Sequence, residues 1–377
     1  MSLFSELCLK GYAGQNAFIG YLNHQNLSRL CKICVAYVSY YTGLTQLMIG
    51  LQNIISPLRG IKILTYHRVN GEEQYNLGLT ISVSNFERQI RYLKMNCNIL
   101  SLQEAVQILN NGQKIPPKSV AITFDDGYED NYVNAFPILK RYGIPATIFL
   151  SVMHINNGTR LWVDQIVDAM DQLSGDYLDL TNLSMGVYKT KTVEDKQKAI
   201  YEISKIIKKS LLPQKKKVIN YLETLSSTHK FKNPMLSWEQ IKEMKNYGIS
   251  FGSHCMNHFI LTKIPIQDAA FEIIQSKKVL EDKLGKEISF FAYPNGSMGD
   301  FNDQIIELLK DAGYSCACTL ISGSNRVGVN LYELKRRNIS EQMSTGLFGR
   351  FSTPIFGLHM SNIPSLFKLE KRVASPR

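Results

Sequence analysis

The sequence predicts an α/β protein in which short buried strands alternate with helices around a parallel sheet. From Gly60 onward, short apolar runs alternate with helical segments that begin at capping residues. Carboxylate or imidazole side chains directly follow several of these runs, at strand ends of the kind where barrel enzymes carry their working groups. The 377 residues are 44% hydrophobic, which is enough to bury a full core and excludes a disordered chain. We therefore expect one large βα domain with an appended segment.

The first half of this domain contains two helices with clear starts. Ser84 with Glu87, and again Ser101 with Glu104, match the capping box, in which a hydroxyl and a carboxylate satisfy the first amides of a helix. A further helix is expected at 132–142. The strands of this half are predicted at 61–66, 119–124 and 144–150.

Residues 155–235 differ from the alternating pattern on both sides of them. The stretch is long, charged and helical in its period, since Leu161, Ile166, Val167 and Met170 are spaced for one helical face. Long excursions of this kind in a compact domain are usually functional. We predict a helical insertion that covers the barrel mouth.

The alternating pattern resumes after the insertion. Ser237 with Gln240 forms another capping pair, and Gly248 and Gly285 mark the ends of two helices. The elements predicted here are strands at 249–252, 288–293 and 316–320 and a helix at 303–312. We place the whole barrel domain at 60–345.

The N-terminal segment, residues 1–59, is expected to be helical and to contact a membrane surface. Residues 33–57 carry no charge and are long enough to span a bilayer, but polar and tyrosine side chains dilute them. An interfacial or domain-packed helix is therefore favoured over a spanning one. Arg29, Lys32 and Arg59 flank the stretch, which suits anionic headgroups.

The compartment is predicted from the start of the chain and from its cysteines. Glu6 interrupts the beginning, and no basic segment leads into an apolar core, so we expect no cleavable signal peptide. The seven cysteines are scattered, which favours a reducing compartment, and the Cys31–Cys34 pair lacks a second pair for a metal. We expect a cytoplasmic or peripherally membrane-associated protein.

The formal charge of +11 favours anionic partners such as phospholipid surfaces or lipid phosphates. A solvated helix face and a loose basic tail at 346–377 are nevertheless favoured over a dedicated binding patch as the explanation of this excess. No nucleic-acid-binding motif accompanies the charge, so no nucleic-acid partner is expected. The basic residues concerned are Lys205, Lys208, Lys209, Lys215, Lys216, Lys217, Lys368, Lys371, Arg372 and Arg377.

Two motifs carry the chemistry. Asp125 and Asp126 follow the strand at 119–124, and neighbouring carboxylates stay ionised together most easily beside a cation. His254 and His258 follow the strand at 249–252, and in a helical turn this spacing puts both rings on one face. Together these residues predict a metal site.

Two further strand ends complete the pattern. His67 follows the first strand, where the alternative is a neutral histidine of the core. The segment 290–296 ends a strand in a tight turn, at which a backbone amide can face the site.

These motifs, in this order, resemble the NodB-homology polysaccharide deacetylases, carbohydrate esterase family 4. The resemblance covers residues 60–339 and is strongest at Thr-Phe-Asp-Asp-Gly (123–127), at the His-x-x-x-His pair and at Phe-Ala-Tyr-Pro-x-Gly (291–296). Leu-Ser-Trp (236–238) and Leu-Trp-Val-Asp (161–164) agree as well. The early Tyr-His at 66–67 is typical of the variety found among exopolysaccharide and lipid-linked sugar enzymes.

The resemblance implies a distorted (β/α)7 barrel, a divalent metal, most often zinc, and hydrolysis of an N-acyl group from an amino sugar. It assigns the metal to Asp126, His254 and His258, the catalytic base to Asp125, and the general acid to His67. The substrate is expected to be an amino-sugar glycan or a lipid-linked sugar. Oxyanion and substrate contacts are expected from Trp162, Asp164, Tyr293, Pro294, Asn295 and Gly296.

Several points stay open at this level. Many members place an arginine before the Pro-x-Gly turn to orient the base, whereas this chain has Phe291, Ala292 and Tyr293 there. His359 is an alternative late general acid. An acetyl group is favoured, with a deformylase of a lipid-linked amino sugar and a non-catalytic membrane-associated sugar-binding barrel as the alternatives.

Overall fold

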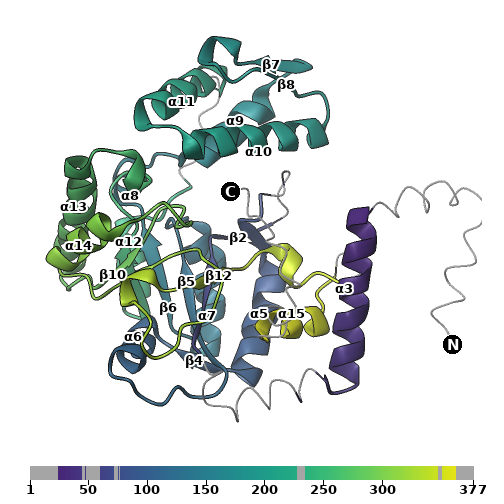
Figure 1. Cartoon of the computed structure of the whole chain (residues 1–377), viewed down its shortest axis with the longest axis vertical. Coiled ribbons are helices and arrows are strands. Elements are labelled where there is room, and N and C mark those ends of the chain that lie inside the picture. The colour runs from purple at the N-terminus through teal and green to yellow at the C-terminus, as the bar shows by residue number, and fades with distance from the viewer. Residues whose placement is uncertain are drawn as a thin grey trace, which may run out of the picture. The chain divides into compact units, whose positions relative to one another are not determined.

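The chain forms two compact units, and each has its own packing (Figure 1). The computed structural model describes residues 24–44, 47, 60–71, 75, 77–226, 234–346 and 350–361. The larger unit covers 55–342 and 372–377, and the smaller one covers 1–54 and 343–371.

A parallel sheet of seven strands, nearly closed into a barrel, forms the centre of the larger unit, as the sequence predicted. An isolated bridge joins Cys318, in one edge strand, to Leu334, two residues before the other edge strand. A short eighth strand, β4 (Asn98–Leu100), pairs beside β5. In spatial order the seven strands are β11 (Cys316–Cys318), β10 (Phe290–Ala292), β9 (Ile249–Ser253), β6 (Ala146–Leu150), β5 (Ser119–Phe124), β1 (Lys62–Tyr66) and β12 (Arg336–Asn338).

Amphipathic helices connect these strands. The capping boxes at Ser101 and Ser237 are formed as predicted. The predicted box of Ser84 with Glu87 is wrong: Ser82 caps the helix instead, and Glu87 pairs with Arg141. The helix predicted at 132–142 begins with a π-helical turn, η2 (Asn131–Ala135). The α-helices are α5 (Val83–Asn96), α6 (Leu102–Asn110), α7 (Phe136–Tyr142), α12 (Trp238–Lys245), α13 (Ile266–Leu284) and α14 (Asp303–Asp311).

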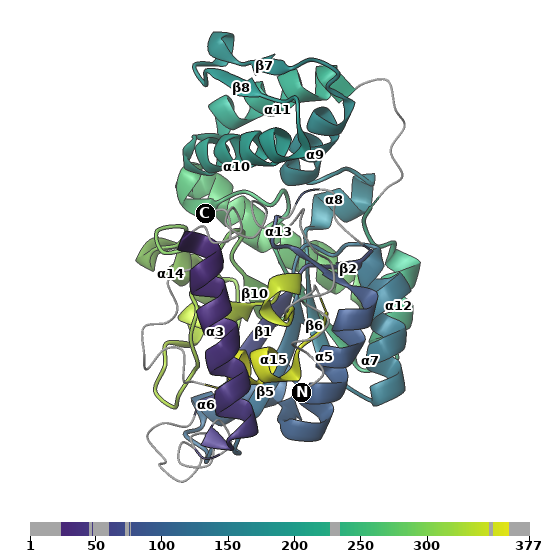
Figure 2. The same ribbon diagram turned by 90° about the vertical axis from the view of Figure 1, so that its right-hand side faces the viewer.

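The insertion between β6 and α12 forms a group of helices with a hairpin (Figure 2). Its hydrophobic cluster also includes Tyr75 and Leu77, from the segment that follows β1. The insertion is not purely helical, because a short antiparallel hairpin, β7 (Tyr177–Asp179) with β8 (Val187–Lys189), lies between two of its helices. Each hairpin strand has only three residues, which is too short to give an alternating pattern. The helices are α8 (Val152–Asn157), α9 (Trp162–Gln172), α10 (Val193–Lys209) and α11 (Leu212–Ser226).

In the smaller unit, α3 (His24–Tyr41) packs against α15 (Thr353–Met360). Ile33 and Ala36 meet Ile355 in a small apolar cluster, and the Ser352 hydroxyl lies 3.2 Å from the Tyr37 hydroxyl. Part of the predicted tail at 346–377 is therefore helical, whereas Lys368, Lys371, Arg372 and Arg377 lie outside the described residues. Among the described residues, no helix is long and apolar enough to cross a membrane.

Candidate active site

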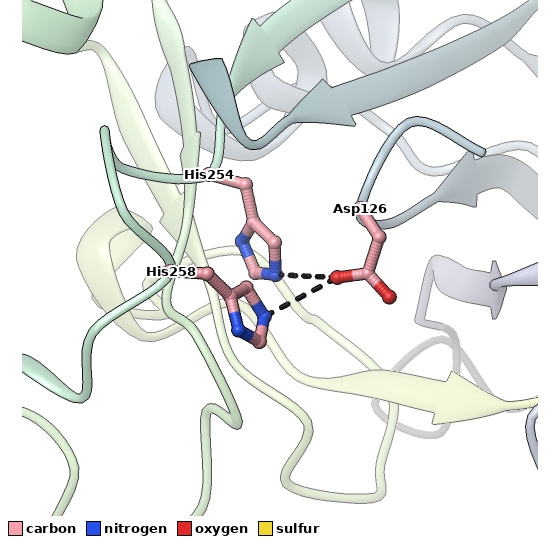
Figure 3. Close-up of side chains that lie close together, drawn as sticks. All are labelled: Asp126, His254 and His258. Atoms are coloured by element: carbon pink, nitrogen blue, oxygen red, sulfur yellow. Dashed lines mark ion pairs between the residues drawn. The ribbon is translucent and has the colours of Figure 1, made fainter. Parts of the chain in front are cut away.

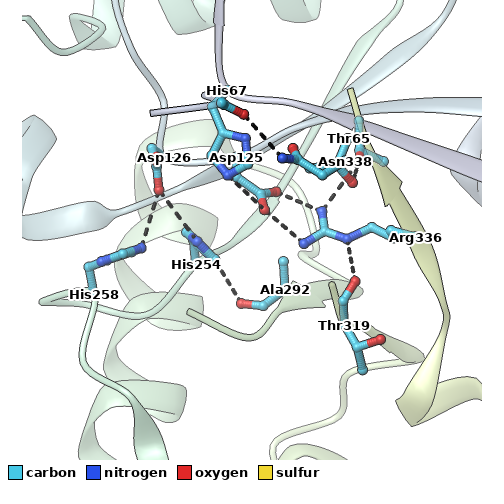
Figure 4. A network of polar contacts seen from close by, with 12 residues as sticks. Thr65, His67, Asp125, Asp126, His254, His258, Ala292, Thr319, Arg336 and Asn338 are labelled. Carbon is cyan, nitrogen blue, oxygen red and sulfur yellow. Dashed lines mark hydrogen bonds and ion pairs between the residues drawn. The ribbon is translucent and has the colours of Figure 1, made fainter. Parts of the chain in front are cut away.

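The candidate site lies at the carboxyl ends of the barrel strands. His67 follows β1, Asp125 and Asp126 follow β5, and His254 follows β9. Parallel strands end at the same edge of a sheet, so these side chains meet although they are far apart in sequence. Figure 4 shows these side chains around one centre, with Asp125 between His67 and Arg336 of β12.

Asp126, His254 and His258 form a three-residue cluster suited to a metal ion (Figure 3). Their ligand atoms all lie within 4.8 Å of one another. The Asp126 Oδ1 atom is 3.5 Å from Nε2 of His254 and 3.2 Å from Nε2 of His258. Within the described ranges, no second group of three metal-ligating side chains converges in this way.

The backbone that presents this cluster is a loop and not the helical turn that the sequence predicted. Cys255 and His258 have φ values of 67° and 54°, which a helix does not allow, and Asp126 has a φ of 75°. Such values are costly for residues other than glycine and are common at functional sites. The surrounding structure therefore holds the two rings, with centroids 4.9 Å apart, in a conformation that local propensity would not choose.

The orientation of His254 is fixed by a hydrogen bond. Its Nδ1 lies 2.7 Å from the carbonyl oxygen of Ala292, at the end of β10. A carbonyl only accepts, so Nδ1 carries a proton, and Nε2, the nitrogen that faces Asp126, is the one left for a metal ion, an arrangement typical of metal-binding histidines. Burial lowers the pKa of His258 to about 4 although Asp126 opposes this, so His258 is neutral at pH 7. Both rings are thus suited to donate to a cation.

Asp125 is held by an arginine that the sequence did not identify. The Arg336 Nη1 and Nη2 atoms donate to the two Asp125 carboxylate oxygens, each at 2.7 Å. Arg336 also donates from Nε to the carbonyl of Thr319 at 2.8 Å, and both members of the ion pair are buried. Burial alone would raise the pKa of Asp125, but the guanidinium holds it below its ordinary value. Arg336 thus fixes the orientation and the charge of this carboxylate.

His67 lies on the other side of Asp125, with Nε2 3.9 Å from the Asp125 Oδ2 atom. Its ring is buried, and Nδ1 has no hydrogen-bond partner. Burial lowers the pKa of His67, although Asp126 and Asp125 raise it in part. The alternative late histidine, His359, lies on α15 in the smaller unit.

The turn after β10 contributes its backbone more than its side chains. The Tyr293 ring is buried against Phe301, and its hydroxyl donates to the Tyr332 carbonyl. The Asn295 amide donates to an Asp300 oxygen at 2.5 Å. Pro294 and Gly296 complete the turn, and a Cβ on Gly296 would lie 2.8 Å from the amide nitrogen of Leu320. The tight fold of this turn explains the need for glycine.

Trp162 and Asp164 open α9 of the insertion. Asp164 is buried, accepts a hydrogen bond from the Tyr128 hydroxyl at 3.1 Å and lies 3.6 Å from an Arg68 nitrogen. Burial raises the pKa of Asp164 to about 6. The Trp162 ring instead contacts lysine side chains of the insertion, the nearer being Lys215 at 4.9 Å. Asp164 therefore connects the insertion to the segment after His67 and is not part of the metal cluster.

Comparison with known proteins agrees with this fold. The model of the polysaccharide deacetylase family matches residues 112–317. The Bacillus subtilis (strain 168) protein YxkH is 26% identical over 292 residues, which cover 77% of this chain and 75% of that protein. A poly-beta-1,6-N-acetyl-D-glucosamine N-deacetylase of Staphylococcus aureus (strain MSSA476) is 30% identical over 244 residues, with 55% of this chain and 79% of that protein covered.

Two solved structures share the architecture. The Streptococcus pyogenes deacetylase PplD in complex with acetate matches with a TM-score of 0.52 at 22% identity, over 76% of this chain and 94% of that chain. IcaB from Ammonifex degensii matches with a TM-score of 0.50 at 23% identity, over 75% of this chain and 93% of that chain. At these identities the likeness establishes the fold.

Proposed function

This chain belongs to the polysaccharide deacetylase family, and from that premise we propose that it hydrolyses N-acetyl groups of an amino-sugar glycan with a metal held by Asp126, His254 and His258. The observation that carries the proposal is the placement of Asp125 and His67 beside this cluster, 3.9 Å from each other. An acid and a base next to a metal site are what amide hydrolysis requires. The glycan named for the Staphylococcus aureus relative, poly-β-1,6-N-acetyl-D-glucosamine, exemplifies the substrate class.

The three proposed ligands fit a divalent cation. Two imidazoles and one carboxylate are a common catalytic zinc set that leaves a position for water, so we propose zinc. The buried Asp126 carboxylate and the neutral His258 ring supply the negative charge and the lone pair that such an ion needs. When bound, the cation would supply Lewis-acid activation of water and of the amide carbonyl.

The protein groups would then move the protons. Asp125, kept ionised by Arg336, would accept a proton from the attacking water. His67 would donate a proton to the leaving nitrogen, because an unprotonated amine departs too slowly at neutral pH. The backbone N–H of Asn295, in the turn shaped by Pro294 and Gly296, would stabilise the developing oxyanion.

We also propose that the glycan is met at a membrane surface, where a lipid-linked sugar is one form of the substrate. The support is the exposed apolar face of α3 and the residues just after it, where Val35, Val38, Tyr41 and Leu47 are all more than half exposed. Apolar side chains on one exposed face, on a chain with a charge of +11, suit an anionic lipid surface.

The decisive experiment couples metal content to product release. The full chain, loaded with one equivalent of zinc, is incubated with N-acetylglucosamine oligomers and with their N-formyl counterparts, and acetate, formate and free amine are quantified. We expect acetate and amine in equal amounts, released about a hundredfold more slowly by Asp125→Asn. Formate release alone would replace the proposal by a deformylase. Oligomer binding without either product would indicate a non-catalytic sugar-binding barrel.

A further inference from the structure

Two lysines of the insertion converge on one aromatic side chain. The Lys215 Nζ atom, in the first turn of α11, lies 4.9 Å from the ring centroid of Trp162, and the Lys208 Nζ atom, near the end of α10, lies 6.0 Å from it. Lys215 also lies 6.0 Å from the ring of Phe259, the residue that follows His258. Three elements of the insertion thus bring two amines to the loop that carries the proposed metal ligands.

Electrostatic interactions place both amines close to the proposed catalytic centre. The charge of Lys215 lowers the pKa of His154 on α8, although burial is the larger cause. Lys208 in turn interacts with the charges of Asp300 and Asp126. The 6.0 Å distance from the Lys215 Nζ atom to the Phe259 ring places this amine beside the loop that carries the proposed metal ligands, and Trp162 links it to Lys208.

The surroundings of these two amines disfavour their protonated, positively charged forms. Burial lowers the pKa of Lys215 to about 7, with the charge of Lys208 as a second cause, and burial lowers that of Lys208 to about 8. Both side chains are half-buried, and among the residues that the structure describes no carboxylate forms a salt bridge with Lys215. The aromatic ring offsets part of this cost for Lys215, and an anion would offset more of it.

We propose that Lys208 and Lys215, arranged around Trp162, form a subsite for a phosphate group of the substrate, beside the sugar whose acetyl group is removed. This inference rests on the proposed deacetylase function and narrows its substrate to a phosphorylated amino sugar. Two ammonium groups supply several donors for the oxygens of one phosphate, whose negative charge they balance. The phosphate comes either from the glycan itself or from the phosphodiester of a lipid carrier, since both present the same oxygens.

The test compares matched probes. The neutral probe is tri-N-acetylchitotriose, and the soluble anionic probe is the same trisaccharide phosphorylated at one C6 hydroxyl. The third probe is N-acetylglucosamine joined by a phosphodiester to a polyprenyl chain in phosphatidylcholine vesicles. The kcat/KM for acetate release is measured for each probe with the zinc-loaded full chain, and binding of the two trisaccharides is measured by calorimetry.

We expect kcat/KM to be at least about tenfold higher for one phosphorylated probe than for the neutral one, and whichever probe gains identifies the source of the phosphate. Lys208→Gln with Lys215→Gln should remove that preference, at about tenfold per lysine, the size of one charge-assisted hydrogen bond. The loss on the neutral probe, which has no phosphate, should be clearly smaller than the loss on the phosphorylated probe, and the double arginine variant should keep the preference. The control pair Lys209→Gln with Lys216→Gln removes the same charge from exposed positions and should change nothing.

Three results overturn the subsite. These are equal kcat/KM and affinity for neutral and phosphorylated probes, a preference that survives in the double glutamine variant, and an equal loss on every probe, which would make the lysines structural. If no probe releases acetate, the proposed function fails. In that case calorimetry still tests the subsite. The wild-type chain should bind the phosphorylated trisaccharide more tightly than the double glutamine variant does, and equal affinities would exclude the subsite.

Discussion

Replacing Arg336 by methionine is expected to disable Asp125 without removing the proposed metal ligands. The substitution deletes the two 2.7 Å hydrogen bonds to Asp125 and leaves a carboxylate that is 1% exposed without its cation. Breaking a buried ion pair from one side costs about 3–5 kcal/mol of folding stability. Loss of an oriented, ionised base should lower kcat/KM by about a hundredfold.

The pH dependence follows from the direction of the shift. In the wild-type chain the pKa of Asp125 is below its unfolded value, so Asp125 stabilises the fold above the unfolded pKa and loses this contribution as the pH falls through the folded pKa. Without Arg336, burial raises the pKa of Asp125, and the carboxylate destabilises the fold at neutral pH. Arg336→Met should therefore be most destabilised at pH 7 and less so near pH 4.

The assay combines urea unfolding at several pH values with the pH profile of kcat/KM at saturating zinc. The acidic limb of kcat/KM should move to higher pH in Arg336→Met, and Arg336→Lys should recover part of the activity. Lys335→Met is the matched control, because this exposed lysine precedes Arg336 and its removal leaves the buried pair intact. An unchanged acidic limb with full metal content would refute the role of Arg336 in orienting and ionising the base.

Four further substitutions or sets test the remaining assignments. His254→Ala should lower the zinc content, measured by atomic emission, by at least about tenfold, because mutating even a residue that only hydrogen-bonds to a metal ligand lowers metal affinity by that factor. Full zinc occupancy would exclude His254 as a ligand. Asp125→Asn should keep zinc and lose turnover by about a hundredfold, whereas Asp126→Asn should lose both, because an amide oxygen is a poorer ligand. His67→Ala should behave like Asp125→Asn, and a fully active His67→Ala with an inactive His359→Ala would transfer the acid role to the late histidine. Glutamine at the exposed apolar positions of α3 should weaken binding to anionic vesicles and leave activity on soluble oligomers unchanged, and unaltered vesicle binding would contradict the membrane proposal.

The strands that carry the site could be predicted because their residues are buried on both faces. The six residues Ser119–Phe124 of β5 are all buried and form one apolar run, which the sequence located without error. The seventh strand, β12, escaped prediction since its three residues, Arg336, Arg337 and Asn338, are polar. A strand sequence with two arginines looks like that of an exposed loop, because arginine is rarely buried unless it is paired.

The convergence of the acidic and imidazole groups was also predictable, whereas the path of the backbone was not. Consecutive motifs at the ends of parallel strands must meet, whatever lies between them. The four-residue spacing of His254 and His258 suggested a helix, but positive φ values at Cys255 and His258 build a loop instead. Spacing alone does not distinguish these two solutions, because both bring the rings to one side.

The position of Arg336 shows why sequence order does not predict which residue orients the proposed base, Asp125. The segment before the turn, where the family resemblance leads one to expect an arginine, is occupied by Phe291 and Tyr293, which are buried in the core. The cation comes instead from 211 residues beyond Asp125. In the sheet register Arg336 lies opposite Ile63, near the start of β1, whereas Asp125 follows the end of β5. The long side chain of Arg336 spans this distance to the carboxylate. In a nearly closed barrel several strands have an inward-facing position from which a guanidinium can reach the same carboxylate. The requirement for a buried positive charge beside Asp125 is therefore fixed by electrostatics, while the strand that supplies it is free to differ between chains.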